Sequence, residues 1–105
     1  MKYLFAALAL MASAAQATGT QDFEVSELGI VRGSGYAFIT IAPAQTISDC
    51  PRKDMIRWEL STEEDKAIFS MALTAQTTNQ KLRVHMVDGD CLGDSGRPNI
   101  TRLVK

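Results

Sequence analysis

The sequence predicts a small, mostly β domain with one helix, and three observations lead to this prediction. Five short segments either alternate hydrophobic and polar residues or concentrate β-branched and aromatic residues, which are signatures of strands. One segment between them starts with acidic residues and then repeats hydrophobic residues at helical spacing. Two cysteines, Cys50 and Cys91, lie on either side of that helical segment. The expected order of elements is β-β-β-α-β-β.

The first residues have the features of a secretory signal peptide, which we assign to residues 1–17. An apolar run from Tyr3 to Ala12 is followed by Ala15-Gln16-Ala17, which has the A-x-A form of a cleavage site. The apolar run is shorter than the about 20 residues that span a bilayer. We expect an exported protein, periplasmic or secreted and without membrane insertion, whose residues 18–105 form a single domain. The short leader is typical of bacteria.

Two strands are expected in the first part of the domain. Residues 23–31 alternate at first and then slip, which indicates a strand with a bulge near Gly29. Residues 32–35 contain two glycines and predict a tight turn. Residues 36–41 are rich in β-branched and aromatic residues and predict a strand paired back on the first.

The third strand and the helix follow directly on each other. Residues 55–60 alternate, so that Trp58 points into the core. The run Ser61-Thr62-Glu63-Glu64 predicts a capping box with Ser61 as N-cap and Glu64 as its partner. We expect the helix to reach Thr77 and Asn79 to cap it in a left-handed conformation. The expected inner face holds Ile68, Met71, Ala72 and Ala75, and the outer face Lys66, Ser70, Thr74 and Thr77.

Two more strands are expected after the helix, at residues 81–87 and 100–104, with a turn-rich loop at 88–99 between them. A single helix between strands three and four predicts a small five-stranded barrel of the OB-fold type, in which the helix plugs one end. An antiparallel sheet with one packed helix is the alternative that the same pattern allows.

The two cysteines predict a disulfide. Cys50 and Cys91 are the only cysteines of an exported chain, and thiols oxidise outside the cytoplasm. Closing a loop of about 40 residues stabilises a fold by about 4 kcal/mol in the chain-entropy model. A reactive thiol pair or a metal site would need a C-x-x-C spacing or nearby histidines, which the sequence lacks.

The charge of the domain argues against nucleic acid as a partner. Without the leader, which holds Lys2 and no acid, the chain has 10 Lys and Arg against 12 Asp and Glu, a net charge of about −2. Positive and negative residues are interspersed, so no basic stripe is present to contact a phosphate backbone.

One stretch, "CLGDSGRP" at residues 91–98, resembles the nucleophile segment of chymotrypsin-type serine proteases. A catalytic triad also needs a histidine as base, and His85 is the only histidine of the chain, on the outward side of an expected strand. We therefore interpret Ser95 as a turn residue and expect neither catalytic residues nor enzymatic activity.

The same loop is acidic. Asp88, Asp90 and Asp94 offer oxygen ligands, but the twelve-residue spacing of an EF-hand fails because position twelve is Asn99. A looser calcium site in the segment from Asp88 to Asp94 stays open, although a solvated acidic turn is the favoured interpretation. We expect neither a metal ion nor a cofactor.

The segment from Cys50 to Cys91 resembles the receptor-binding B subunits of subtilase-type cytotoxins. The shared pattern is a cysteine, a tryptophan-bearing strand, a helix with small residues, a basic and apolar strand and a second cysteine. It rests on Cys50, Trp58, Ala72, Leu73, Lys81, Arg83, Val84 and Cys91. Asn79 stands where such turns commonly hold glycine. The resemblance implies a non-catalytic module that binds cell-surface glycans, assembles as a ring of five and carries a catalytic A subunit.

A candidate ligand site lies at the first turn. Arg32, Ser34 and Tyr36 combine an aromatic ring with hydrogen-bonding groups, a combination that suits a sugar. A half-buried strand position is the alternative for Tyr36, because aromatic residues are common in strands. We expect an exported glycan-binding module, with a stand-alone periplasmic or secreted protein-binding protein, such as an inhibitor, as the alternative.

Overall fold

The structure is a computed structural model that describes residues 19–105. The expected signal peptide at residues 1–17 lies outside the described residues. The elements are β1 (Gly19–Val31), β2 (Tyr36–Ala42), β3 (Arg52–Glu59), α2 (Glu63–Thr78), β4 (Lys81–Met86), β5 (Cys91–Leu92), β6 (Ser95–Gly96) and β7 (Ile100–Val104). No helix among residues 19–105 is long and apolar enough to cross a membrane.

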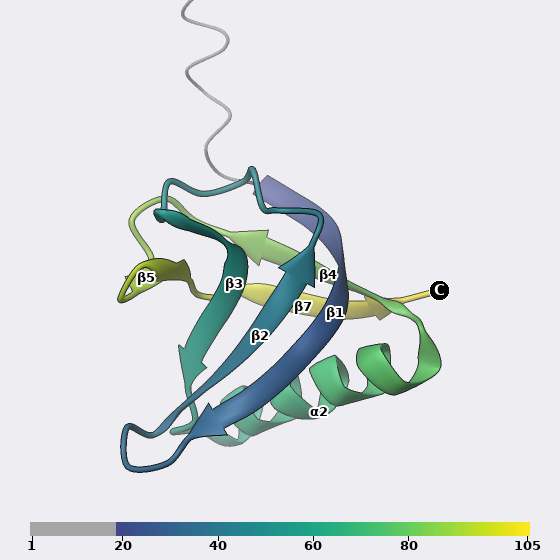
Figure 1. The fold of residues 1–105 in the computed structure, drawn as a ribbon, viewed down its shortest axis with the longest axis horizontal. Coiled ribbons are helices and arrows are strands. Elements are labelled where there is room, and N and C mark those ends of the chain that lie inside the picture. Colours follow the sequence, from purple (N-terminus) through teal and green to yellow (C-terminus); the bar gives the residue numbers. More distant parts are fainter. Residues whose placement is uncertain (1–18) are drawn as a thin grey trace, which may run out of the picture.

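The strands form one mostly antiparallel sheet in the order β5-β6-β3-β2-β1-β4-β7. The long strand β1 joins its two halves, because residues 19–23 pair with β4 and residues 24–31 pair with β2 (Figure 1). The register shifts between Val25 and Glu27, just after β1 passes from β4 to β2 between Phe23 and Glu24. The position expected for the bulge, near Gly29, is therefore wrong, because the bulge lies a few residues earlier in the strand.

The sheet has seven strands rather than five, and it does not close on itself. Four expected strands begin or end one to four residues away from their expected limits, and the strand at residues 100–104 is confirmed. The two additional strands, β5 and β6, form a small hairpin inside the expected loop. β6 runs parallel to β3, a pairing between distant segments that local sequence patterns do not reveal.

The helix begins one residue later than expected. Thr62 rather than Ser61 is the N-cap, and its side chain accepts a hydrogen bond from the backbone N–H of Asp65, whose carboxylate accepts in return from the N–H of Thr62. At the other end, Asn79 adopts the expected left-handed conformation, with φ of 56°. α2 packs against β1, β4 and β7 and lies across one side of the strands (Figure 1).

The core fills the space between the strands and the helix. As expected, Trp58 is buried, and its indole N–H donates to the carbonyl oxygen of Asp65 at 2.9 Å. Ala72 and Ala75 are the buried residues of α2, while Ile68 and Met71 pack against the core at its margin. The strands contribute Phe23, Val25, Ala37, Ile39, Ile41, Ile56, Leu82, Val84 and Met86.

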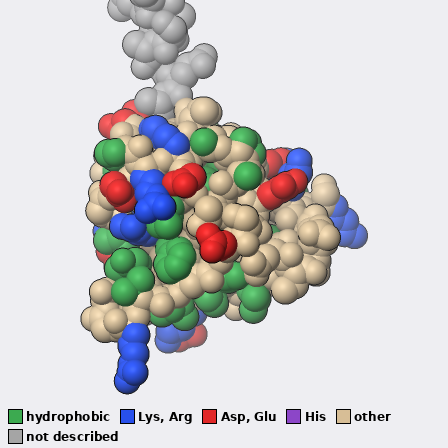
Figure 2. All heavy atoms as spheres, in the orientation of Figure 1, with side chains coloured by type: hydrophobic (Ala, Val, Ile, Leu, Met, Phe, Trp, Pro, Cys, Tyr) green, Lys and Arg blue, Asp and Glu red, His purple; other side chains and the backbone are tan. Residues whose placement is uncertain are grey.

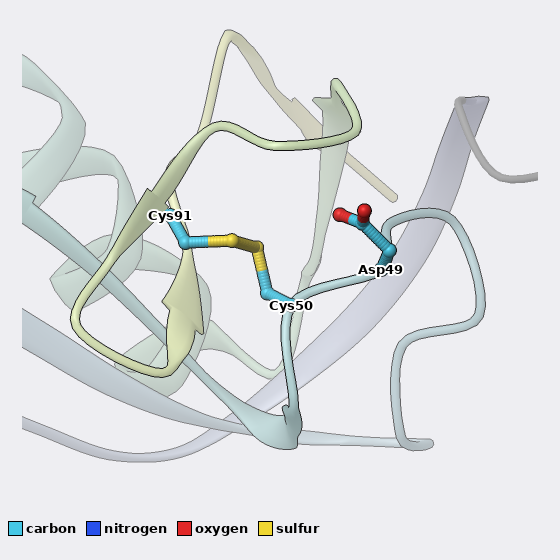
Figure 3. A group of neighbouring side chains, drawn as sticks. All are labelled: Asp49, Cys50 and Cys91. Carbon is cyan, nitrogen blue, oxygen red and sulfur yellow. A yellow bond between two sulfur atoms is a disulfide. The ribbon is translucent and has the colours of Figure 1, made fainter.

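The expected disulfide between Cys50 and Cys91 is confirmed. The two Cα atoms are 5.9 Å apart, a usual distance for such a bond. Cys50 precedes β3 and Cys91 begins β5, so the bond fastens the β5–β6 hairpin to the start of β3 (Figure 3).

Candidate binding face

The outer face of β2 and β3 carries the candidate site. Tyr36 lies opposite Glu59 and Phe38 lies opposite Arg57 in the antiparallel ladder, so these four side chains share one face. The residues between them on each strand point into the core. Charged and hydrophobic side chains accordingly lie side by side on the side of the molecule where β2 and β3 run (Figure 2).

The ring of Phe38 lies close against Gly29 of β1. Gly29 is its partner in the ladder, and a Cβ atom at that position would meet ring atoms of Phe38 at 2.7 and 2.8 Å. A residue with a Cβ atom at position 29 would displace the ring from this position. The ring of Phe38 is half-buried and adds an apolar surface beside Tyr36.

Arg57 is fixed over the ring of Tyr36. Its guanidinium carbon lies 5.7 Å from the ring centroid, within the range of a cation–π contact. Its Nη1 atom lies 3.5 Å from Oδ1 of Asp94, which the β5–β6 turn supplies. Gly93 allows this approach, because its φ is +64° and a Cβ there would meet Nη1 at 3.2 Å. The side chain of Arg57 keeps 23% of its surface exposed.

Arg97 ties the β5–β6 hairpin to the end of β3. Its Nε and Nη2 atoms donate to the two carboxylate oxygens of Glu59 at 2.9 and 2.6 Å, and its Nη1 donates to Asp90 at 3.1 Å. The hydrogen bonds from Arg97 hold the pKa of Glu59 below its ordinary value. The same contacts raise the pKa of Arg97. The hairpin is thus fixed by a disulfide on one side and by a bidentate ion pair on the other.

The structure brings only part of the expected ligand site together. Arg32 and Ser34 lie exposed in the turn between β1 and β2, and Tyr36 is half-buried at the start of β2. The partner of the Tyr36 ring is Arg57 of the neighbouring strand. Alternation predicts that Arg57 points outward, but only the strand register places it beside Phe38, which is why the sequence did not reveal it.

The acidic loop makes its contacts within the protein. Oδ1 of Asp88 accepts from the N–H of Asp49, and Oδ1 of Asp49 accepts from the N–H of Gly89, both at 2.8 to 2.9 Å. Asp90 pairs with Arg97, and Asp94 accepts from the hydroxyl of Ser95. Among residues 19–105, Asp49 groups with the two cysteines, whose sulfur atoms are bonded to each other (Figure 3). The solvated acidic turn and the looser calcium site both stay predictions.

Ser95 is a buried strand residue rather than the expected turn residue. The turn itself is formed by Gly93 and Asp94, and Ser95 begins β6 with no exposed surface. Its hydroxyl donates to Oδ1 of Asp94 at 3.1 Å. His85 lies on β4, where its Nδ1 atom is 3.0 Å from the hydroxyl of Thr20. Ser95 and His85 therefore each pair with a different residue, Ser95 with Asp94 and His85 with Thr20.

No family model matches the chain, and neither the comparison with curated proteins nor the comparison with solved structures gives a match.

Proposed function

We propose that the protein is an exported, non-catalytic module that binds a glycan on the outer face of β2 and β3. The observation that carries this proposal is the arginine fixed over Tyr36, with the ring of Phe38 beside it. An aromatic surface suits the apolar face of a sugar ring, and guanidinium and carboxylate groups suit its hydroxyls. The exposed turn with Arg32 and Ser34 borders the same face and would contact neighbouring sugar units.

The arrangement of the strands supports an OB-fold interpretation. Five longer strands with one helix between the third and fourth, and a first strand shared between both halves of the sheet, agree with that fold. OB-folds bind oligosaccharides on the face of their second and third strands and on the loop between the first two. In this chain those elements are β2, β3 and the turn at residues 32–35, which coincide with the proposed site.

A glycan array probed with the oxidised protein tests the proposal. The wild type should bind a defined set of glycans, while Tyr36→Ala and Arg57→Gln should lose most of that signal. Arg102→Gln is the matched control, because Arg102 is an exposed arginine of β7 outside the proposed face. An array without signal, or signal that survives both substitutions, would refute glycan binding on this face.

The proposal includes a homo-oligomer, with the ring of five as the assembly that the resemblance implies. β7 is an edge strand, and pairing between copies would cover its free side. The exposed polar residues of α2, which are Lys66, Ser70, Thr74 and Thr77, would then face a central opening or a catalytic partner. Light scattering at micromolar concentration should give a multiple of the subunit mass, and a monomer throughout would reject the ring.

A stand-alone protein-binding role is the second candidate. Ile100 at the start of β7 keeps 50% of its surface exposed beside the free edge, a combination that suits strand addition by another protein. An inhibitor would use this edge rather than the outer face of β2 and β3. Two results together would favour this second role. The glycan array would give no signal, and the protein would form a complex with another protein that Ile100→Asp abolishes.

A further inference from the structure

A groove lies between the end of α2 and the bulge of β1, and none of its lining residues belongs to the proposed glycan site on the outer face of β2 and β3. Its main cavity has a volume of about 280 Å³, and water takes about 30 Å³ per molecule in the liquid. An adjoining hollow of about 170 Å³ shares Glu24 and Ala42 with it and extends to Lys81. Together they reach the size of small-ligand sites. The polar lining of the main cavity comes from Glu24, Ser26, Gln76, Asn79 and Gln80.

The walls of the groove are fixed to each other across the bulge. Ser26 lies at the register shift of β1, and its hydroxyl donates to the carbonyl oxygen of Thr40 at 3.1 Å. From α2, the side-chain amide of Gln76 donates to the carbonyl oxygen of Ser26, also at 3.1 Å. Strand and helix are thus joined by two residues that line the cavity, and the site exists before any ligand arrives.

The groove favours positive charge. The carbonyl oxygen of Ala75 accepts from the backbone N–H groups of Asn79 and Gln80. The remaining carbonyl groups at the end of a helix carry a partial negative charge. The last turn of α2 holds no basic residue. Beside it, the carboxylate of Glu24 makes no hydrogen bond or ion pair within residues 19–105, and the side-chain amide of Asn79 makes none either. The main cavity therefore has one carboxylate and several oxygen acceptors in its lining and no basic side chain.

The other charges at the groove lie in the adjoining hollow. Asp22 is held there by Arg83, whose Nε donates to its carboxylate at 2.7 Å. Lys81 also lines this hollow and brings one positive charge to its far end. A negatively charged ligand would be repelled by Glu24 and by the carbonyl end of the helix. An apolar ligand would remove water from the carboxylate without supplying hydrogen bonds in its place.

We propose that this groove binds a small organic ligand through a primary ammonium group. Glu24 supplies the opposite charge, and the side-chain oxygens of Gln76 and Asn79 accept the remaining N–H bonds. The ammonium lies at the end of α2, where the dipole of the helix adds to the attraction. This site is separate from the proposed glycan face and does not depend on it.

A titration followed by NMR of the ¹⁵N-labelled, oxidised protein tests the proposal with two matched probes. Ethanolamine carries an ammonium group, and ethylene glycol has a hydroxyl in its place. Ethanolamine should cause saturable shifts of the amide signals of Gln76, Asn79 and Gln80, which 0.5 M salt should weaken by screening. Ethylene glycol should cause none. Equal shifts with both probes would overturn the proposal.

A pair of substitutions on β1 distinguishes ligand binding in the groove from a general effect of the charge of the protein. Glu24→Gln should weaken ethanolamine binding about fivefold, as expected for the loss of one partly exposed ion pair. Glu27→Gln makes the same change three residues away, outside the groove, and should leave the affinity unchanged. The spectra themselves report that both variants are folded. An affinity that is equal in the wild type and Glu24→Gln would contradict the proposal.

Discussion

The guanidinium of Arg57 lies over the ring of Tyr36, 5.7 Å from its centroid, although the two residues are 21 positions apart. β2 and β3 place them on one face, and Asp94 of the β5–β6 turn holds the arginine there. A side chain fixed in this way loses little freedom when a ligand binds, which favours affinity. The hairpin that supplies Asp94 is therefore part of the proposed binding face.

The first prediction concerns the contact between Asp94 and Arg57. Asp94→Ala should lower glycan affinity about threefold to tenfold, because Arg57 loses the partner that fixes it and must be ordered by the ligand. Equilibrium titration with a glycan identified on the array measures the effect. The control is Asp54→Ala, which breaks the similarly exposed pair with Arg52 and should leave affinity unchanged. Equal effects of both substitutions would show that the contact has no special role.

The second prediction concerns the contact between Gly29 and the ring of Phe38. Gly29→Ala should lower the free energy of unfolding by about 1–3 kcal/mol, because the new methyl group overlaps the ring and displaces it. Urea denaturation measures the change. Gly19→Ala on the same strand is the control, since its Cβ would meet its nearest atom at an ordinary 3.6 Å. A Gly29→Ala protein as stable as the control would contradict this role of glycine.

The third prediction concerns pH and the ion pair between Glu59 and Arg97. The folded pKa of Glu59 lies below its unfolded value, so its contribution is complete above pH ~4.3 and is lost as the pH falls through the folded pKa. At pH 7, Glu59→Gln should cost about 0.5–1 kcal/mol, since the carboxylate is 45% exposed and screened by solvent. The difference between the wild type and the variant should shrink in denaturation curves recorded below pH ~4.3. A difference that grows in acid would have the wrong sign.

The fourth prediction concerns the disulfide. Cys50→Ala combined with Cys91→Ala should lower the free energy of unfolding by about 4 kcal/mol, because a loop of 41 residues is no longer closed in the unfolded chain. It should also weaken glycan binding, since the hairpin with Asp94 loses one of its attachments. Urea denaturation and glycan titration measure the two effects. A double variant with wild-type stability and wild-type affinity would contradict both.

Local patterns in the sequence predict most of the elements, and the helix start shows where they fail. The sequence predicts a capping box that starts at Ser61, whereas the structure has one that starts at Thr62. In that first turn the indole N–H of Trp58 donates to the carbonyl oxygen of Asp65. This contact joins the strand before the helix to the helix itself. Tertiary contacts of this kind are invisible to a local capping rule.

The candidate site was predicted only in part for a similar reason. Tyr36 and the turn at residues 32–35 stand out as an aromatic residue beside polar ones in one stretch of sequence. Arg57 and Asp94 come from β3 and from the β5–β6 turn, and they reach Tyr36 through strand register and a parallel pairing. Periodicity gives the side of a strand on which a residue lies, whereas register between strands depends on contacts between distant segments.

The most direct test of the glycan face is to map the bound ligand on the protein. The ¹⁵N-labelled, oxidised protein is titrated with the oligosaccharide that gives the strongest array signal, and amide shifts are followed by NMR. Saturable shifts should concentrate on β2, β3 and the turn at residues 32–35, with Tyr36, Phe38 and Arg57 among the largest. Shifts that are absent from these strands, or confined to the groove at the end of α2, would contradict the account.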